Sequence, residues 1–273
     1  MDPVPTPPLI VKVGGSLLPS REGYRLVAEA LAPILDQGPT WVVVSAAKGV
    51  TDALHAAIAG QEDPDAVLRL HERLFAGPLP QHLLGWFRTA RAAAQAGSPE
   101  ALLAWGEQAS AELLRTQLAD LGHDLAVVEL EPSASPPMAR RAIVPGFYVR
   151  GAEGAIQVLP RGGSDISAVM AARWVGAPEV RLWKEGGGIR LQPGVTVDRV
   201  DAQTLVHWLG DRVRPMHPAA VRLAAQAGIG LLLEDPWGAD GSTRIVPVPL
   251  VGQTAAPMAG TPVTDRVAGS ATL

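Results

Sequence analysis

Short apolar runs, each followed by glycine or small polar residues, constrain the fold of this chain most. Leu9–Val13, Trp41–Val44 and Val180–Trp183 are rich in apolar residues and lack a regular polar alternation. Such runs are typical of strands that are buried on both faces of a sheet. Helical stretches such as Glu22–Gln37 and Ala202–Leu209 separate them. We therefore predict an α/β fold in which helices cover both faces of a largely parallel sheet.

Composition narrows the possible functions. The chain has 273 residues, of which 47% are apolar and only 4% aromatic, so aliphatic side chains must fill the core. A net charge of −4 without a basic block argues against nucleic acid as a partner. The absence of cysteine excludes disulfides and zinc–sulfur sites. No apolar run reaches membrane-spanning length and no leader peptide is evident, so we expect a cytoplasmic protein with no membrane partner.

The chain divides into three expected segments. Residues 1–8 are proline-rich and should form an N-terminal arm. Residues 9–247 carry the alternating pattern and should form one domain. Residues 248–273 are rich in glycine, alanine, proline and threonine without periodicity, which predicts a C-terminal tail.

The segment from Arg161 to Asp165 places an arginine, two glycines, a serine and an aspartate directly before an apolar helical run. Glycines let backbone N–H groups approach a ligand, and a helix start favours an anion. Arg161 offers paired donors to a carboxylate or phosphate, and Asp165 could hold Mg²⁺ or orient a lysine. The alternative is a plain helix start with Ser164 or Asp165 as N-cap. From these residues alone, both interpretations stay open.

Two predicted strands end in residues that suit a ligand. Lys12 lies in the first strand, just before Gly14–Gly15, which predicts close backbone approach to a phosphate beside one long cation. Ser45 and Thr51 follow the second strand, where the carboxyl edge of a parallel sheet forms a crevice. The alternatives are an ordinary glycine turn in the first case and a helix cap at Thr51 or Asp52 in the second.

Taken in order, these stretches resemble the amino acid kinase superfamily, and most closely the catalytic domain of aspartate kinase. The matching stretches are Lys12–Ser16, Val43–Asp52, Gly106–Glu107, Arg161–Asp165 and His217–Val221, within a similarity that runs from about Leu9 to Ile245. The resemblance implies a three-layer α/β/α sandwich, ATP and Mg²⁺ as cofactors without a dedicated protein metal site, and a homodimer. The ACT regulatory domains usual after this domain are expected to be absent, so lysine or threonine should not inhibit.

The resemblance also implies roles at the phosphates. Lys12 would neutralise the transferring phosphoryl group, and Asp165 would orient that lysine and Mg²⁺. Gly14, Gly15 and Ser16 would form the loop along the nucleotide phosphates.

On the acceptor side, the resemblance implies that the substrate is held by Ser45, Thr51, Glu107, Arg161 and Ser164. Glu107 would take the substrate ammonium, and Arg161 would grip a carboxylate.

The nucleotide loop departs from the family pattern. Lys184, Glu185 and Arg214 match nucleotide-binding positions, with the register at Arg214 uncertain. Three glycines at 186–188 replace an acidic loop, and an Asp-Pro-Arg sequence that usually follows is missing. These losses predict weak ATP binding.

Three functions follow from the resemblance. The first is phosphorylation of L-aspartate to 4-phospho-L-aspartate with ATP, on the route to lysine, threonine and methionine. The second is a kinase for another small carboxylate or phosphate acceptor. The third is a ligand-binding pseudokinase or partner subunit.

Overall fold

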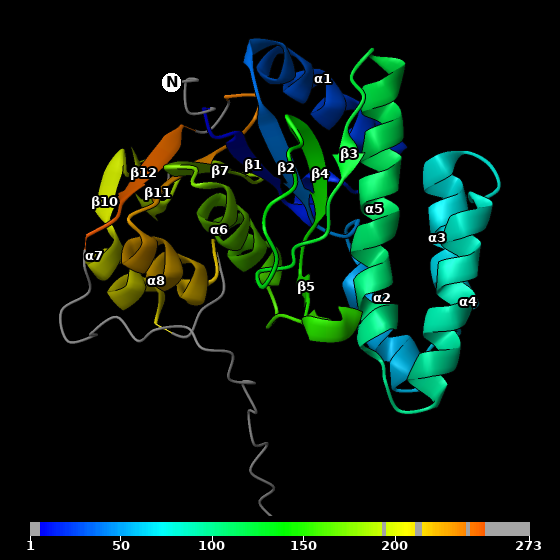
Figure 1. Ribbon diagram of the computed structural model, residues 1–273. Helices are drawn as coiled ribbons and strands as arrows, with labels where there is room; N and C mark the ends of the chain where they lie inside the picture. Colours follow the sequence, from blue (N-terminus) through cyan, green and yellow to red (C-terminus); the bar gives the residue numbers. More distant parts are fainter. Residues whose placement is uncertain (1–5, 193–194, 211–214, 239–240, 249–273) are drawn as a thin grey trace, which may run out of the picture.

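A twisted central sheet organises the molecule, seen in a computed structural model that describes residues 6–192, 195–210, 215–238 and 241–248 (Figure 1). In this part of the chain, eight strands pair in the order β10-β12-β11-β7-β1-β2-β4-β3. Their bounds are β1 Leu9–Val13, β2 Thr40–Val44, β3 Ala126–Val127, β4 Arg141–Pro145, β7 Glu179–Trp183, β10 Arg199–Asp201, β11 Gly230–Glu234 and β12 Ser242–Val246. All neighbours pair in parallel except β11 and β12, which are antiparallel.

Two hairpins lie outside this sheet. β5 (Tyr148–Arg150) pairs with β6 (Ile156–Val158), and β8 (Arg190–Gln192) pairs with β9 (Val195–Thr196). Both pairs are antiparallel and short.

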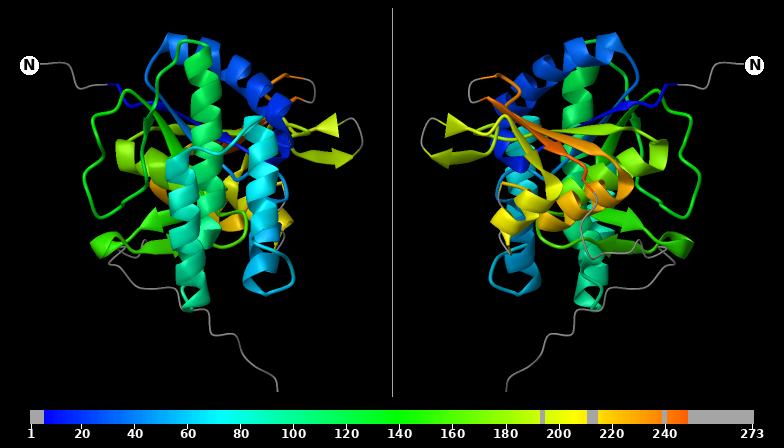
Figure 2. Two further views of the ribbon diagram at one scale, coloured as in Figure 1. Left: turned by 90° about the vertical axis from the view of Figure 1, so that its right-hand side faces the viewer. Right: turned by 90° about the vertical axis from the view of Figure 1, so that its left-hand side faces the viewer.

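Helices cover both faces of the sheet, which confirms the predicted three-layer α/β/α fold (Figure 2). One face carries α1 Arg21–Gln37, α2 Val50–Ile58, α3 Asp65–Phe75, α4 Gln81–Gln95 and α5 Glu100–Asp120. The other face carries α6 Gly163–Val175, α7 Ala202–Leu209 and α8 Pro218–Ala227. None of the described helices combines the length and the apolarity needed to cross a membrane.

Alternation along the strands divides the core in two. Val11 and Val13 of β1 pack with α1 and α5, whereas Ile10 packs with α6 and α8. Both sets are fully buried, as expected for a parallel sheet covered on both faces. Each face therefore holds its own helices by hydrophobic contact.

Strand β1 is the centre of the sheet and defines where the site lies. It pairs with β2 on one side and with β7 on the other, although β2 comes next in the chain and β7 much later. Gly14 N–H donates to the Trp183 carbonyl (3.0 Å), and Ser45 N–H donates to the Val13 carbonyl (3.1 Å). The carboxyl ends of the three strands thus meet at a topological switch point, the usual position of a ligand crevice.

Candidate functional site

A buried carboxylate between two lysines forms the centre of the site. Lys12 Nζ lies 2.9 Å from Asp165 Oδ1, and Lys184 Nζ donates to Asp165 Oδ2 at 2.7 Å. The His217 backbone N–H also donates to Oδ2 (3.2 Å), and Lys184 Nζ donates to the Pro215 carbonyl (2.5 Å). The triad joins β1, α6 and the end of β7.

The electrostatics of this triad favour an anionic ligand. Burial alone would raise the pKa of Asp165, but the charges of Lys12 and Lys184 outweigh it and hold this pKa well below its usual range. Asp165 is 2% exposed and stays ionised. Two cations on one anion leave a net positive charge in a site of low dielectric, where charge interactions are strong. Such a centre is suited to a phosphate.

The glycines after β1 are required by close backbone contacts. A Cβ at Gly14 would lie 3.0 Å from the Trp183 carbonyl oxygen and 3.6 Å from Lys12 Nζ. At Gly15 it would lie 2.6 Å from the Ala46 carbonyl oxygen, closer than any side chain tolerates. Ser16 follows in a 3₁₀ turn and is exposed. The loop predicted to follow the phosphates therefore lies beside the lysine triad.

The helix starts differ from the capping alternatives. The N-cap of α6 is Gly162 at φ +83°, and Ser164 and Asp165 lie inside the first turn as buried residues. The N-cap of α2 is Gly49 at φ +85°, so Thr51 and Asp52 are not caps either. The cap interpretations were wrong because glycine makes these left-handed turns without a side-chain acceptor.

Ser164 faces the end of β4. A Cβ at Gly146 would lie only 2.8 Å from Ser164 Cβ, so glycine at the end of this strand makes room for the serine. Gly163 is equally confined, since a Cβ there would lie 2.6 Å from Leu159 Cβ. These contacts fix the first turn of α6 against the sheet.

Glu107 supplies a second, separate acid. It is 2% exposed on α5, its side chain accepts the Ala46 backbone N–H, and its Oε2 contacts no hydrogen-bond donor among the described residues. Burial raises the pKa of Glu107 to about 8, although the Ala46 N–H and the charge of Lys12 lower it in part. An unpartnered buried oxygen is costly, so this position favours a ligand that brings a donor.

The remaining predicted acceptor residues border the start of α2. Arg161 is exposed, and its Nη2 donates to Asp52 Oδ1 at 2.9 Å. Ser45 and Thr51 are half-buried at the end of β2 and in the first turn of α2. Because an exposed ion pair contributes little to stability, Arg161 can exchange Asp52 for a ligand carboxylate at small cost.

The glycine-rich loop is an ordered turn. Gly186 and Gly187 have φ of +85° and +59°, and Gly187 N–H donates to the Lys184 carbonyl (3.2 Å). A Cβ at Gly188 would lie 2.5 Å from Thr196 Cγ2. A valine at Gly186 would be strained at this positive φ, so the backbone conformation of the loop requires glycine there. Glu185 is exposed, and Arg214 lies outside the described residues.

Sequence reasoning missed two contributors to the triad. The His217 N–H and the Pro215 carbonyl bind it through the backbone, which leaves no signal in residue type. A second set of polar contacts lies behind Glu107: the Ser110 hydroxyl, three residues further along α5, bonds the Ser45 carbonyl oxygen and the Tyr24 hydroxyl. The spacing from Glu107 places Ser110 on the same face of α5, whereas Tyr24 on α1 carries no such signal.

The described residues offer little direct coordination to a metal. They contain no group of three or more Asp, Glu or His side chains that could hold an ion. Asp165 supplies the carboxylate of the Lys12–Asp165–Lys184 triad, and both its oxygens pair with lysines. Mg²⁺ commonly retains water and binds through one carboxylate and substrate phosphates, and this donor set fits that mode.

The sequence matches a known protein family. The model of the family described as "Amino acid kinase family" matches residues 7–234. Aspartokinase from Chlamydia pneumoniae is 29% identical over 226 residues, covering 70% of this chain and 50% of the relative. Aspartokinase from Thermus thermophilus is 25% identical over 267 residues, covering 87% and 58%. The chain thus spans little more than half the length of these relatives.

A solved structure shares the fold. The crystal structure of E. coli aspartokinase III in complex with aspartate and ADP superposes with a TM-score of 0.71 at 18% identity, over 88% of this chain and 65% of that one. The family match covers most of the sequence and includes every described residue of the lysine triad and Glu107. This chain belongs to the amino acid kinase family.

Proposed function

We propose that this protein phosphorylates the side-chain carboxylate of L-aspartate with ATP, giving 4-phospho-L-aspartate. The observation that carries the proposal is the pairing of two buried centres at one edge of the sheet. The Lys12–Asp165–Lys184 triad suits phosphates, and Glu107, which experiences the charge of Lys12, suits an ammonium group. Similarity to two aspartokinases supports aspartate as the acceptor.

The acceptor would be held at both ends. Its ammonium group would donate to the unpartnered Oε2 of Glu107, which loses its proton in exchange. Its α-carboxylate would pair with Arg161, which releases Asp52. Ser45, Thr51 and Ser164 would supply hydroxyl contacts around the substrate. These contacts leave the side-chain carboxylate directed at the phosphate centre.

The chemistry then needs no general base, because a carboxylate is already a nucleophile. One carboxylate oxygen forms a bond to the γ-phosphorus while the bond to the bridging oxygen of ADP breaks. Phosphoryl transfer is mainly positioning and charge stabilisation. Lys12 and Lys184 would neutralise the charge, with Asp165 holding both in place. Mg²⁺, when bound, would neutralise further charge on the phosphates.

The test is trapping of the acyl phosphate by hydroxylamine, with aspartate, glutamate and acetylglutamate as acceptors and ATP or GTP as donor. We expect an aspartate-dependent hydroxamate. Product formed with a different acceptor would show that the protein is a kinase whose substrate is not aspartate. No product with any acceptor, together with no ATP binding by calorimetry, would contradict catalysis and favour a ligand-binding role.

A further inference from the structure

A chain of buried hydroxyl groups lies behind the acceptor site. Tyr24 on α1 and Ser110 on α5 are both 0% exposed, and their hydroxyl oxygens are 2.7 Å apart. The Ser110 hydroxyl also bonds the Ser45 carbonyl oxygen at 2.6 Å. These hydrogen bonds thus run from α1 through α5 to the residue after β2.

The Ser45 carbonyl fixes the direction in which these hydroxyl groups donate their hydrogen bonds. A carbonyl oxygen can only accept, so Ser110 must give its single proton to Ser45. Tyr24 must then donate to Ser110. Burial raises the pKa of Tyr24 far above its ordinary value, which keeps the proton that this arrangement requires. Every hydroxyl in the chain therefore has a defined partner.

The hydrogen bonds of Tyr24 and Ser110 reach the candidate site at the Ser45–Ala46 turn. The Ala46 backbone N–H binds the Glu107 carboxylate, and the Ala46 carbonyl oxygen lies against Gly15. Ser110 lies one turn after Glu107 on the same helix, so its bond to Ser45 ties that helix to the turn. Displacement of the turn would carry the Ala46 N–H away from the Glu107 carboxylate.

We propose that Ser110 and Tyr24 are positioning residues that set the affinity for the substrate ammonium. They do so by holding the Ser45–Ala46 turn against Glu107, without touching the substrate. The inference rests on the proposed function and names two residues outside its binding set. Because the phosphate centre depends on Lys12 and Asp165, loss of either hydroxyl should affect acceptor binding and spare nucleotide binding.

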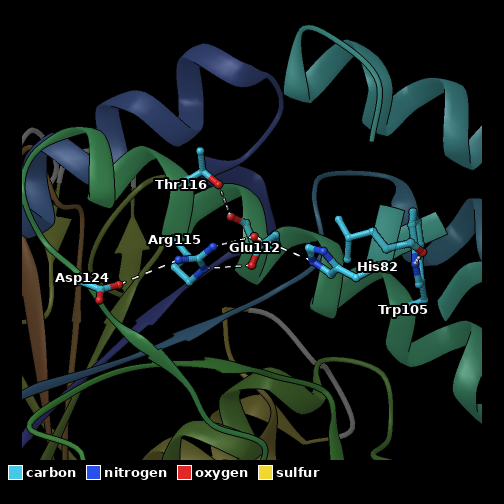
Figure 3. A network of polar contacts seen from close by, with 7 residues as sticks. His82, Trp105, Glu112, Arg115, Thr116 and Asp124 are labelled. Atoms are coloured by element: carbon cyan, nitrogen blue, oxygen red, sulfur yellow. Dashed lines mark hydrogen bonds and ion pairs between the residues drawn. The ribbon is translucent and has the colours of Figure 1, made fainter. Parts of the chain in front are cut away.

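The experiment compares Ser110→Ala, Tyr24→Phe and the double variant. Thr116→Val is the matched control, because Thr116 is also on α5 but its hydroxyl donates to the Glu112 carbonyl (2.9 Å) in a separate network (Figure 3). That network includes Arg115, which binds the Glu112 carboxylate. Each variant is assayed for the KM of aspartate, the KM of ATP and kcat, with its melting temperature recorded.

We expect Ser110→Ala to raise the aspartate KM about tenfold, with kcat and the ATP KM within about twofold, as for a lost buried hydrogen bond. Tyr24→Phe should raise it less, because the bond from Ser110 to Ser45 remains. The double variant should resemble Ser110→Ala, since the two hydroxyls act in series. Thr116→Val should match the unsubstituted protein.

Contrary outcomes separate the two proposals. If the unsubstituted protein forms no acyl phosphate, the proposed function fails and the positioning role fails with it. If it is active and folded Ser110→Ala keeps the original aspartate KM, only the positioning role is overturned. Equal damage to both KM values and kcat would indicate a structural role and also overturn it. Should Ser110→Ala fail to fold, an unchanged aspartate KM in Tyr24→Phe decides against the proposal.

Discussion

At the scale of single residues, Glu107 should leave a signature in the pH dependence of stability. The unfolded chain releases this proton near the ordinary glutamate pKa of 4.5, whereas the folded chain keeps it up to about pH 8. The folded state therefore binds the extra proton in this window, and the free energy of unfolding falls as the pH rises through it. The slope approaches roughly 1.4 kcal/mol per pH unit where the difference is one full proton.

Between about pH 6.5 and 8, Glu107 is expected to dominate the pH dependence of the free energy of unfolding. Burial lowers the pKa of His71 to about 4 from 6.5, and burial also lowers the pKa of His217. Below pH 6.5 the unfolded chain therefore binds more protons at these histidines than the folded chain, so their contribution to the free energy of unfolding rises with pH. Asp165, whose pKa is lowered, contributes only below its ordinary 3.8. Glu107→Gln should flatten the slope in urea unfolding without ligand. An unchanged slope would contradict the neutral form of Glu107.

Lys12 should matter for turnover more than for folding. Lys12→Ala removes one of two cations from Asp165 but leaves Lys184 and the His217 N–H in contact with it. We expect kcat with ATP and aspartate to fall by roughly a hundredfold or more, the scale of a lost electrostatic stabiliser. A circular dichroism spectrum and a melting curve show whether the fold persists. Near-native turnover would contradict the assignment of this strand end to the phosphates.

Arg161→Lys separates binding from catalysis. Lysine keeps the charge but cannot make the planar two-point contact with a carboxylate. We expect the aspartate KM to rise while the ATP KM stays unchanged, measured by steady-state kinetics. An unchanged aspartate KM would leave Arg161 as a surface partner of Asp52 only.

At the scale of elements, the loop after β1 should tolerate no side chain. Gly15→Ala places a Cβ 2.6 Å from the Ala46 carbonyl oxygen, so one of the two backbones must move. We expect a loss of about 1–3 kcal/mol in stability and at least roughly tenfold in activity. Gly85→Ala is the control, because Gly85 lies inside α4 with no atom within 4 Å of a new Cβ. It should stabilise by about 0.5–1 kcal/mol. Equal melting temperatures would contradict the contact.

The same scale shows what the sequence could predict. Apolar runs identified β1, β2 and β7, because burial on both faces leaves a strong signal. The hairpin β8–β9 and the edge strand β10 escaped prediction, since two or three residues carry no measurable period. The edge strand β3 (Ala126–Val127) is equally short and likewise carries no period. Helix starts were misjudged because Gly49 and Gly162 take positive φ, which a search for side-chain caps overlooks.

Within the site, residue type predicted the charged groups and left their partners undefined. The local pattern pointed to Lys12 and Asp165, the resemblance added Lys184, and the structure brings the three together. The bond between Tyr24 and Ser110 joins residues 86 positions apart, so only the packing of α1 on α5 reveals it.

At the scale of the whole molecule, the proposed function places the acceptor and the nucleotide on either side of β1. Glu107 and the start of α2 lie on the β2 side, Lys184 lies at the end of β7 near the start of α8, and α6 packs across β1 between them. Lys12 is in the strand between them and contacts Asp165 directly. Such a division predicts that a substitution on one side weakens the binding of one ligand and leaves the binding of the other unchanged.

A crossed binding experiment tests that division. Glu107→Gln should weaken aspartate binding at least roughly tenfold, because an amide cannot neutralise an ammonium group, and should leave the ATP Kd within about twofold. Lys184→Met should do the reverse, since Asp165 keeps Lys12 and the acceptor side is untouched. Both dissociation constants are measured by calorimetry on each variant. If either substitution weakened both ligands equally, the two sides would form one coupled site, and the assignment of acceptor to β2 and nucleotide to β7 would be wrong.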